Sequence, residues 1–354
     1  VGMLAMLRGG KSPATPSEPP ADQQRVSSAT TACPQLSFDK QREAELRHGH
    51  FARISIGMVN YKLWGLGDGT RPLVVTLHGL LGNMGTFTSM AQDLVRGGFD
   101  VLTFDLFGFG LSDSPRKRFD VKLFADQTLE LLSYIGFPNK CKFLLVGFSM
   151  GGLIAMEVAR RSPERIARLM LVAPAGLVPL NALERSGIKA LRAARALHIP
   201  AATVLGKLAG GLEVQAELFE PDVSDSRKSA EVAEKNCLMF RSNPEKYTKA
   251  WLKSVRDMRL GGNGQLYSLL AESGVEVMFL WGDSDSTVPL AEIQEELRGF
   301  FPRAPVLIVK GAGHGLLAEH SDVVAQYAFT WFNGGVEGLR VRANGSENKS
   351  MSVP

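Results

Sequence analysis

A serine lies in the middle of Gly147-Phe148-Ser149-Met150-Gly151, between two apolar runs of different character. The run Phe143–Val146 before it is typical of a buried strand, and the run from Gly152 onward is typical of a helix. Glycines on both sides allow a sharp turn that presents the serine hydroxyl alone at its tip. This pattern predicts a nucleophile elbow with Ser149 as the attacking group.

A serine hydroxyl becomes a good nucleophile only when a base takes its proton and a carboxylate orients that base. Two later strand-like runs, Val275–Trp281 and Val306–Val309, are each followed by a suitable residue. Asp283 and Asp285 follow the first run, and His314 follows the second. Because the carboxyl ends of parallel strands meet at one edge of a sheet, we expect the serine, an acid and the histidine to converge.

A carbonyl oxygen under attack gains negative charge, which backbone N–H groups stabilise well. The amide of Met150, directly after the nucleophile, is one expected donor. The second is the amide of Leu80, in the loop His78–Gly82 that follows the strand-like run Leu73–Leu77. Chemistry of this kind requires no cofactor and no metal ion, and we expect neither.

At these positions the chain resembles the α/β-hydrolase superfamily, in the branch that carries a helical cap. The resemblance covers about residues 51 to 333 and rests on His78-Gly79, Asp105–Ser112, the elbow, Gly282-x-x-Asp285 and Gly313-His314. It implies an α/β fold whose mostly parallel eight-stranded sheet has helices on both faces. It also implies that the acid is Asp285 rather than Asp283, because the family carboxylate stands three residues after the glycine. The Asp105 stretch is then expected to shape the site without taking part in the chemistry.

The resemblance further implies a serine hydrolase that cleaves a carboxylic ester or a related acyl compound through an acyl-enzyme intermediate. Epoxide hydrolases and haloalkane dehalogenases of this superfamily carry an aspartate where this chain has Ser149, which argues against those activities. Phe148 and Gly315 differ from the Asn and Trp that are common in carbon-carbon bond hydrolases. The alternatives are a perhydrolase or a carbon-carbon bond hydrolase with the same triad, or a ligand receptor that retains the triad.

Strand-like and helix-like segments alternate from Leu73 onward, which indicates a parallel sheet covered on both faces. We expect strands at about residues 54–55, 59–63, 73–77, 101–105, 143–146, 169–172, 275–280 and 306–309. Between 178 and 267 the alternation stops and apolar residues recur at helical spacing, which predicts a helical cap between core segments 37–177 and 268–335. The residues expected to face Ser149 from this cap are apolar: Leu180, Leu183, Phe240, Trp251 and Leu260. An apolar cap of this kind favours uncharged esters, because burying an ion without a partner is costly.

The two ends of the chain differ from the core. Residues 1–36 lack any apolar period, which predicts a disordered segment or the end of a truncated targeting segment in a cytoplasmic or organellar protein. Residues 336–354 are expected to form a polar tail. The apolar run near the start is too short for a membrane span.

Composition narrows the partners. The net charge is +4 over 354 residues, and no basic run is longer than Arg116–Arg118, which argues against nucleic acid. Three widely spaced cysteines, Cys33, Cys141 and Cys237, imply neither a disulfide framework nor a zinc site. The expected partner is a small-molecule acyl substrate, and no sequence signal sets the oligomeric state.

Overall fold

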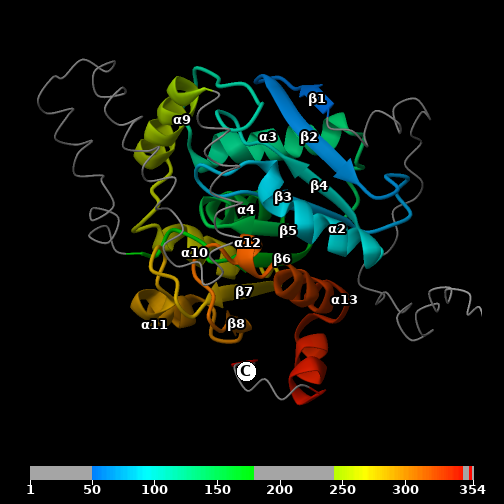
Figure 1. Ribbon diagram of the computed structural model, residues 1–354, viewed down its shortest axis with the longest axis vertical. Coiled ribbons are helices and arrows are strands. Elements are labelled where there is room, and N and C mark those ends of the chain that lie inside the picture. Colours follow the sequence, from blue (N-terminus) through cyan, green and yellow to red (C-terminus); the bar gives the residue numbers. More distant parts are fainter. Residues whose placement is uncertain (1–49, 179–242, 346–350, 353–354) are drawn as a thin grey trace, which may run out of the picture.

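The computed structural model describes residues 50–178, 243–345 and 351–352, and a central sheet runs through this part of the chain (Figure 1). The strand order is β1-β2-β4-β3-β5-β6-β7-β8-β9. The strands are β1 (His50–Arg53), β2 (Met58–Trp64), β3 (Leu73–Leu77), β4 (Asp100–Phe104), β5 (Phe143–Phe148), β6 (Ile166–Val172), β7 (Val277–Gly282), β8 (Val306–Val309) and β9 (Met351–Ser352). Pairing is parallel from β4 to β8 and antiparallel at both edges. The expected mostly parallel sheet of eight strands is confirmed, and the two-residue β9 extends its edge.

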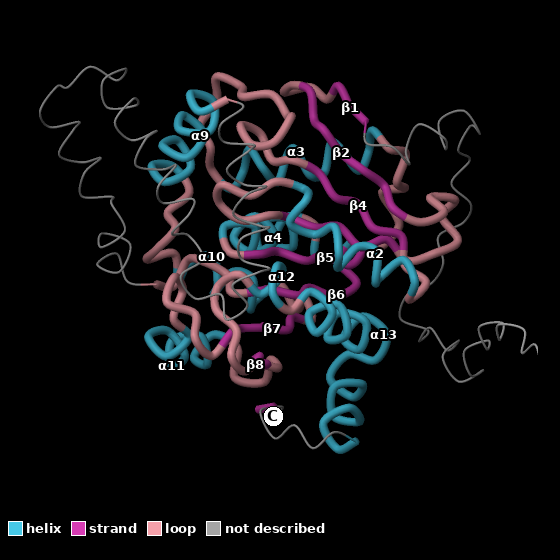
Figure 2. The backbone as a smooth tube through the Cα atoms, viewed as in Figure 1, coloured by secondary structure: helices cyan, strands magenta, loops and turns pink. Residues whose placement is uncertain are grey.

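Helices cover both faces of the sheet, as Figure 2 shows. They are η2 (Met84–Phe87), α2 (Thr88–Arg96), α3 (Val121–Tyr134), α4 (Met150–Arg161), η3 (Pro163–Arg165), α9 (Pro244–Asp257), α10 (Gly264–Glu272), α11 (Leu290–Phe300), α12 (Leu316–Glu319) and α13 (Ser321–Gly345). One apolar cluster joins one sheet face to α3, α4, α9, α10 and α11, and a second joins the other face to α2, α12 and α13. In β3, Val75 belongs to the first cluster and Val74 to the second, because successive side chains point to opposite faces. Strands buried on both faces are therefore mostly apolar, as β3 is apart from Thr76.

The first strand lies earlier than the sequence indicates. β1 is His50–Arg53, whereas the expected strand at residues 54–55 is wrong, because Ile54 begins the turn to β2 and its N–H bonds Gly57 O at 3.1 Å. Ser55 in this turn donates its backbone N–H and its hydroxyl to the Glu130 carboxylate, at 2.9 and 2.7 Å. A short apolar run beside a turn gives too little alternation to place a strand end.

A long insertion separates β6 from β7, and its two ends meet. Gly176 N–H donates to Leu260 O at 2.9 Å, and Asn263 N–H donates to Gly176 O at 2.8 Å. Three of the expected cap residues, Leu180, Leu183 and Phe240, lie outside the described residues. The other two, Trp251 and Leu260, are buried. The expected cap boundary at residue 267 falls within α10.

Helix α13 continues past the residue at which a polar tail was expected. Gly335 has φ 57° and ψ −144° and produces a kink, after which the helix resumes and runs to Gly345. Leu339 is fully buried in the second apolar cluster, and Val336 packs against it. Residues 336–345 are therefore helical, and two consecutive glycines mark a kink rather than the end of the fold.

Cys141 is disulfide-bonded, and its partner lies outside the described residues. The wide spacing of the three cysteines gives no sign of this bond, because separation along the chain does not set separation in space. Within the described ranges, no helix is both long and apolar enough to cross a membrane.

Candidate active site

Ser149 occupies a strained turn between β5 and α4. Its φ of 53° and ψ of −118° lie outside the regions that most residues adopt. The neighbouring glycines are required by space: a Cβ on Gly147 would lie 2.6 Å from Gly151 O, and one on Gly152 would lie 2.6 Å from Pro174 Cβ. The turn therefore presents one hydroxyl, held by a backbone that only this glycine pattern permits.

His314 follows β8 and points at Ser149. Its Nε2 lies 3.0 Å from Ser149 Oγ, and its Nδ1 lies 2.8 Å from Asp285 Oδ2. When Nδ1–H donates to the carboxylate, Nε2 carries a lone pair directed at the serine hydroxyl. The structure thus brings together three side chains that follow three different strands, β5, β7 and β8.

The two aspartates after β7 have separate surroundings. The Asp285 side chain is fully buried, and its Oδ1 accepts the N–H groups of Thr287 at 2.9 Å and Val288 at 2.8 Å. Asp283 is exposed, and its Oδ1 accepts Gly311 N–H at 2.8 Å. Asp285 faces His314, while Asp283 holds the loop after β8 near its start.

The loop after β3 lies beside Ser149. A Cβ on Gly79 would lie 3.2 Å from Ser149 Cβ and 3.2 Å from Phe148 Cδ1. The peptide that joins Gly79 to Leu80 therefore lies next to the elbow. Met150 is the first residue of α4, where backbone N–H groups have no partner within the helix. In the part of the chain that the structure describes, neither the Leu80 amide nor the Met150 amide donates a hydrogen bond.

His78, which belongs to the loop after β3 and to the family motif His78-Gly79, has a defined structural role. Its side chain is buried, with Nδ1 2.8 Å from Gly79 O, and Nε2 accepts Leu106 N–H at 3.0 Å. The accepting Nε2 fixes the neutral tautomer with the proton on Nδ1. Burial lowers the pKa of His78. His78 therefore connects the loop after β3 to the loop after β4.

Asp105 organises the loop after β4 from within. Its carboxylate accepts Met84 N–H at 2.8 Å, Leu111 N–H at 2.8 Å and Asn60 Nδ2–H at 2.7 Å. A Cβ on Gly110, which has φ 49°, would lie 2.0 Å from Asp105 Oδ2. The loop thus folds tightly around one buried carboxylate.

Phe148 lies against the imidazole ring. The centroids of the Phe148 and His314 rings are 5.1 Å apart, and their planes are inclined by 35°. Phe148 therefore lies between Gly79 and His314, and it limits the space in which the imidazole can rotate.

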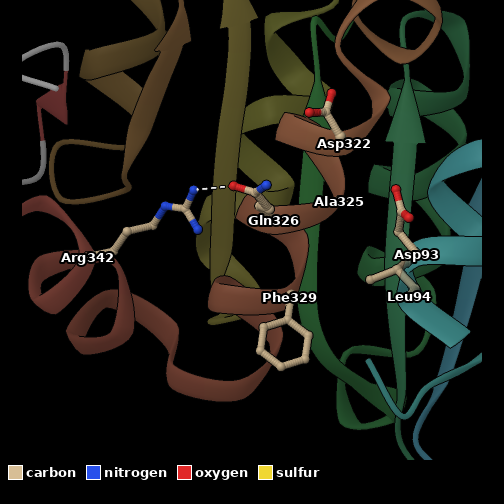
Figure 3. Close-up of a pocket in the computed structure, with 7 residues that line it drawn as sticks. All are labelled: Asp93, Leu94, Asp322, Ala325, Gln326, Phe329 and Arg342. Carbon is tan, nitrogen blue, oxygen red and sulfur yellow. Dashed lines mark hydrogen bonds between the residues drawn. The ribbon is translucent and has the colours of Figure 1, made fainter. Parts of the chain in front are cut away.

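A separate pocket of about 270 Å³ lies between α2 and α13 (Figure 3). Its lining residues are Asp93, Leu94, Asp322, Ala325, Gln326, Phe329 and Arg342. Arg342 Nη2 donates to Gln326 Oε1 at 2.6 Å across its wall (Figure 3). The pocket contains none of the residues gathered around Ser149. Within the described ranges, no group of three or more His, Cys, Asp or Glu side chains could hold a metal ion.

A parallel sheet in this order, with a serine elbow after β5, an acid after β7 and a histidine after β8, has the architecture of an α/β hydrolase. The family model described as alpha/beta hydrolase fold matches residues 72–321, which is more than half of the chain. The chain belongs to the alpha/beta hydrolase family.

Several known proteins are similar over most of the chain. An uncharacterised protein of Mycobacterium tuberculosis is 26% identical over 257 residues, which cover 70% of this chain and 71% of that protein. The sn-1-specific diacylglycerol lipase of Xenopus tropicalis is 27% identical over 262 residues, covering 72% of this chain and 75% of the lipase. The structure of a thermophilic esterase from Thermogutta terrifontis has a TM-score of 0.61 at 22% identity, covering 80% of this chain and 97% of the esterase.

Proposed function

We propose that this protein is a serine hydrolase that cleaves a carboxylic ester or a related acyl compound through an acyl-enzyme intermediate. The observation that carries the proposal is the continuous line of hydrogen bonds from Asp285 through His314 to Ser149, at 2.8 and 3.0 Å. Both distances suit proton transfer. The membership of the chain in the alpha/beta hydrolase family agrees with this chemistry.

In the first half of the proposed reaction, Ser149 Oγ attacks the carbonyl carbon while His314 Nε2 takes the hydroxyl proton. The buried Asp285 carboxylate holds the ring by Nδ1 and stabilises the imidazolium. The Leu80 and Met150 amides donate to the oxyanion. The tetrahedral intermediate collapses, the bond to the alcohol oxygen breaks, and His314 returns the proton to the leaving alcohol. Ser149 now carries the acyl group.

In the second half, a water molecule attacks the acyl carbon and gives a proton to His314 Nε2. The same two amides again stabilise the oxyanion. Collapse breaks the bond to Ser149 Oγ, which recovers its proton from His314, and the carboxylic acid leaves. Every proton movement uses one nitrogen atom, so no cofactor is needed to balance the reaction.

An uncharged, small-molecule ester is the substrate class that we favour. Trp251 and Leu260, in the described part of the insertion, are apolar and buried, and burying an ion near such groups without a partner is costly. Two similar proteins, the lipase of Xenopus tropicalis and the thermophilic esterase, are named for ester hydrolysis.

A fluorophosphonate probe tests the nucleophile directly. We expect the probe to label the parent protein and Ser133→Ala, a control in which an exposed helix serine is replaced, but not Ser149→Ala. Ester hydrolysis by Ser149→Ala should fall by about a thousandfold or more. Labelling of Ser149→Ala equal to that of the parent would overturn the proposal. Labelling of the parent without turnover of any ester would instead favour the receptor, and acyl transfer to peroxide would favour the perhydrolase.

A further inference from the structure

Helix α9, in the insertion, is anchored on the loop that leads from β4 into α3, beside which it lies in Figure 1. Lys253 Nζ donates to Pro115 O at 3.0 Å, and Phe119 N–H donates to Asp257 Oδ2 at 3.1 Å. These two contacts fix the C-terminal half of α9. They involve no residue of the nucleophile elbow.

The N-terminal half of α9 bonds both backbone polar groups of one residue in the same loop. Gly110 N–H donates to the Tyr247 hydroxyl at 2.9 Å, and Lys246 Nζ donates to Gly110 O at 2.8 Å. Tyr247 is 2% exposed, so its hydroxyl bonds Gly110 in a site closed to bulk water. Loss of the hydroxyl would leave a buried N–H without a partner, which is unfavourable.

An aromatic series connects Tyr247 to the loop after β3. The Tyr247 and Phe109 rings meet edge to face with centroids 6.1 Å apart, and the Phe109 and His78 rings meet in the same way at 5.7 Å. Phe109 is fully buried. A well-packed interior transmits displacements rather than absorbing them, so the position of Tyr247 constrains the position of His78.

His78 is followed by Gly79, which lies against the elbow, and by Leu80, one of the two proposed oxyanion donors. It bonds Leu106 N–H, within the loop that Tyr247 supports, and Gly79 lies so close that its Cβ would be 3.2 Å from Ser149 Cβ. Leu80 comes next. A continuous set of contacts therefore runs from α9 to the expected oxyanion donor.

We propose that Tyr247 is a positioning residue: by holding Gly110 and packing on Phe109, it sets the place of His78 and hence of the Leu80 amide beside Ser149. The inference rests on the proposed function, because the position of the Leu80 amide affects the reaction only if an oxyanion forms beside it. It also gives the insertion a direct effect on the chemical step, separate from covering the substrate.

The test replaces Tyr247 by Phe, which keeps the ring series and removes only the hydroxyl. We expect kcat for p-nitrophenyl butyrate to fall on the order of tenfold, with KM within about twofold. Inhibition by a trifluoromethyl ketone, which forms an oxyanion adduct on the serine, should weaken by the same factor as kcat/KM. Tyr327→Phe, in a buried tyrosine of α13 on the opposite face, is the matched control and should change neither quantity.

Lys246→Met provides an independent variant if Tyr247→Phe does not fold, since it removes the bond to Gly110 O and leaves Tyr247 in place. It should lower kcat in the same direction with KM retained. Parental kcat and parental ketone inhibition in the folded variant would overturn the inference, as would losses explained by the fraction of unfolded protein. Persistence of activity in Ser149→Ala would instead overturn the proposed function, so the two failures are distinguishable.

Discussion

Replacement of Asp285 by Asn should lower kcat strongly because it changes the hydrogen bond to His314. The fold should stay intact. Asp285 Oδ1 accepts the N–H groups of Thr287 and Val288 at 2.9 and 2.8 Å. An asparagine keeps these bonds only by placing its carbonyl oxygen there, which turns its NH₂ group toward His314 Nδ1. Nδ1 must then accept, so the ring proton moves to Nε2.

The displaced proton faces Ser149 Oγ. With Nε2 protonated 3.0 Å from Ser149 Oγ, the imidazole offers a donor where the reaction needs a base. A wrong tautomer of this kind lowers kcat by about 10⁴-fold in a serine triad, or about 5.4 kcal/mol at 1.36 kcal/mol per factor of ten. The backbone bonds to residue 285 survive, so the unfolding temperature should change by only a few degrees.

Asp283→Asn is the matched control, because it makes the same chemical change two residues away on an exposed side chain. Its amide oxygen can still accept Gly311 N–H, so kcat/KM for p-nitrophenyl butyrate should stay within about threefold of the parent. The two variants are compared with the same substrate, after circular dichroism has established that both are folded. A loss in Asp283→Asn as large as that in Asp285→Asn would refute the reasoning.

Three further outcomes can be measured. Gly151→Ala should destabilise the fold by at least about 3 kcal/mol in urea unfolding, because its Cβ would lie 2.1 Å from Leu77 O. Gly299→Ala is the control, since a Cβ there would meet nothing within 4 Å and should be tolerated. Equal stability of the two variants would contradict this steric account. Because burial lowers the pKa of His78 from its ordinary value of 6.5, the folded state resists protonation there. The free energy of unfolding should fall as pH drops below about 6.5, by up to about 1.4 kcal/mol per pH unit, and His78→Asn should reduce this slope; an unchanged slope would count against the assignment. Specificity constants should favour uncharged p-nitrophenyl esters of short to medium chain length over a succinyl half-ester and an emulsified triglyceride, and the reverse order would mean that the insertion provides a cation or an open entrance.

The strands of the sheet could be predicted from their apolar runs. The meeting of Ser149, Asp285 and His314 could be predicted because each of these residues follows such a strand. Ser149 has a glycine pattern that its cramped turn requires, and His314 has an apolar strand directly before it. The choice between Asp283 and Asp285 was less secure, since both follow the same strand. Asp285 is buried and Asp283 is exposed, and the two carboxylates accept different backbone N–H groups. The sequence around two aspartates that stand two positions apart indicates neither difference.

Contacts between distant segments were not predictable. Helical spacing indicated that α9 has an apolar face, but it gave no sign that Tyr247 would bond Gly110, some 137 positions earlier. The kink at Gly335 preserves a helix where two glycines suggest its end, because Leu339 beyond it still reaches the core. The bond at Cys141 likewise depends on which chain segments meet in space.

The two hydrogen bonds that join Gly176 to Leu260 and Asn263 have a consequence for how such a protein can change. They fasten the two ends of the insertion together, so the sheet meets a closed stem of fixed width whatever sequence lies beyond it. Changes of sequence or length between these two ends are therefore expected to leave the spacing of β6 and β7 unchanged, provided that the stem is kept. The insertion can then vary while the strand ends that bring Ser149, Asp285 and His314 together stay in place.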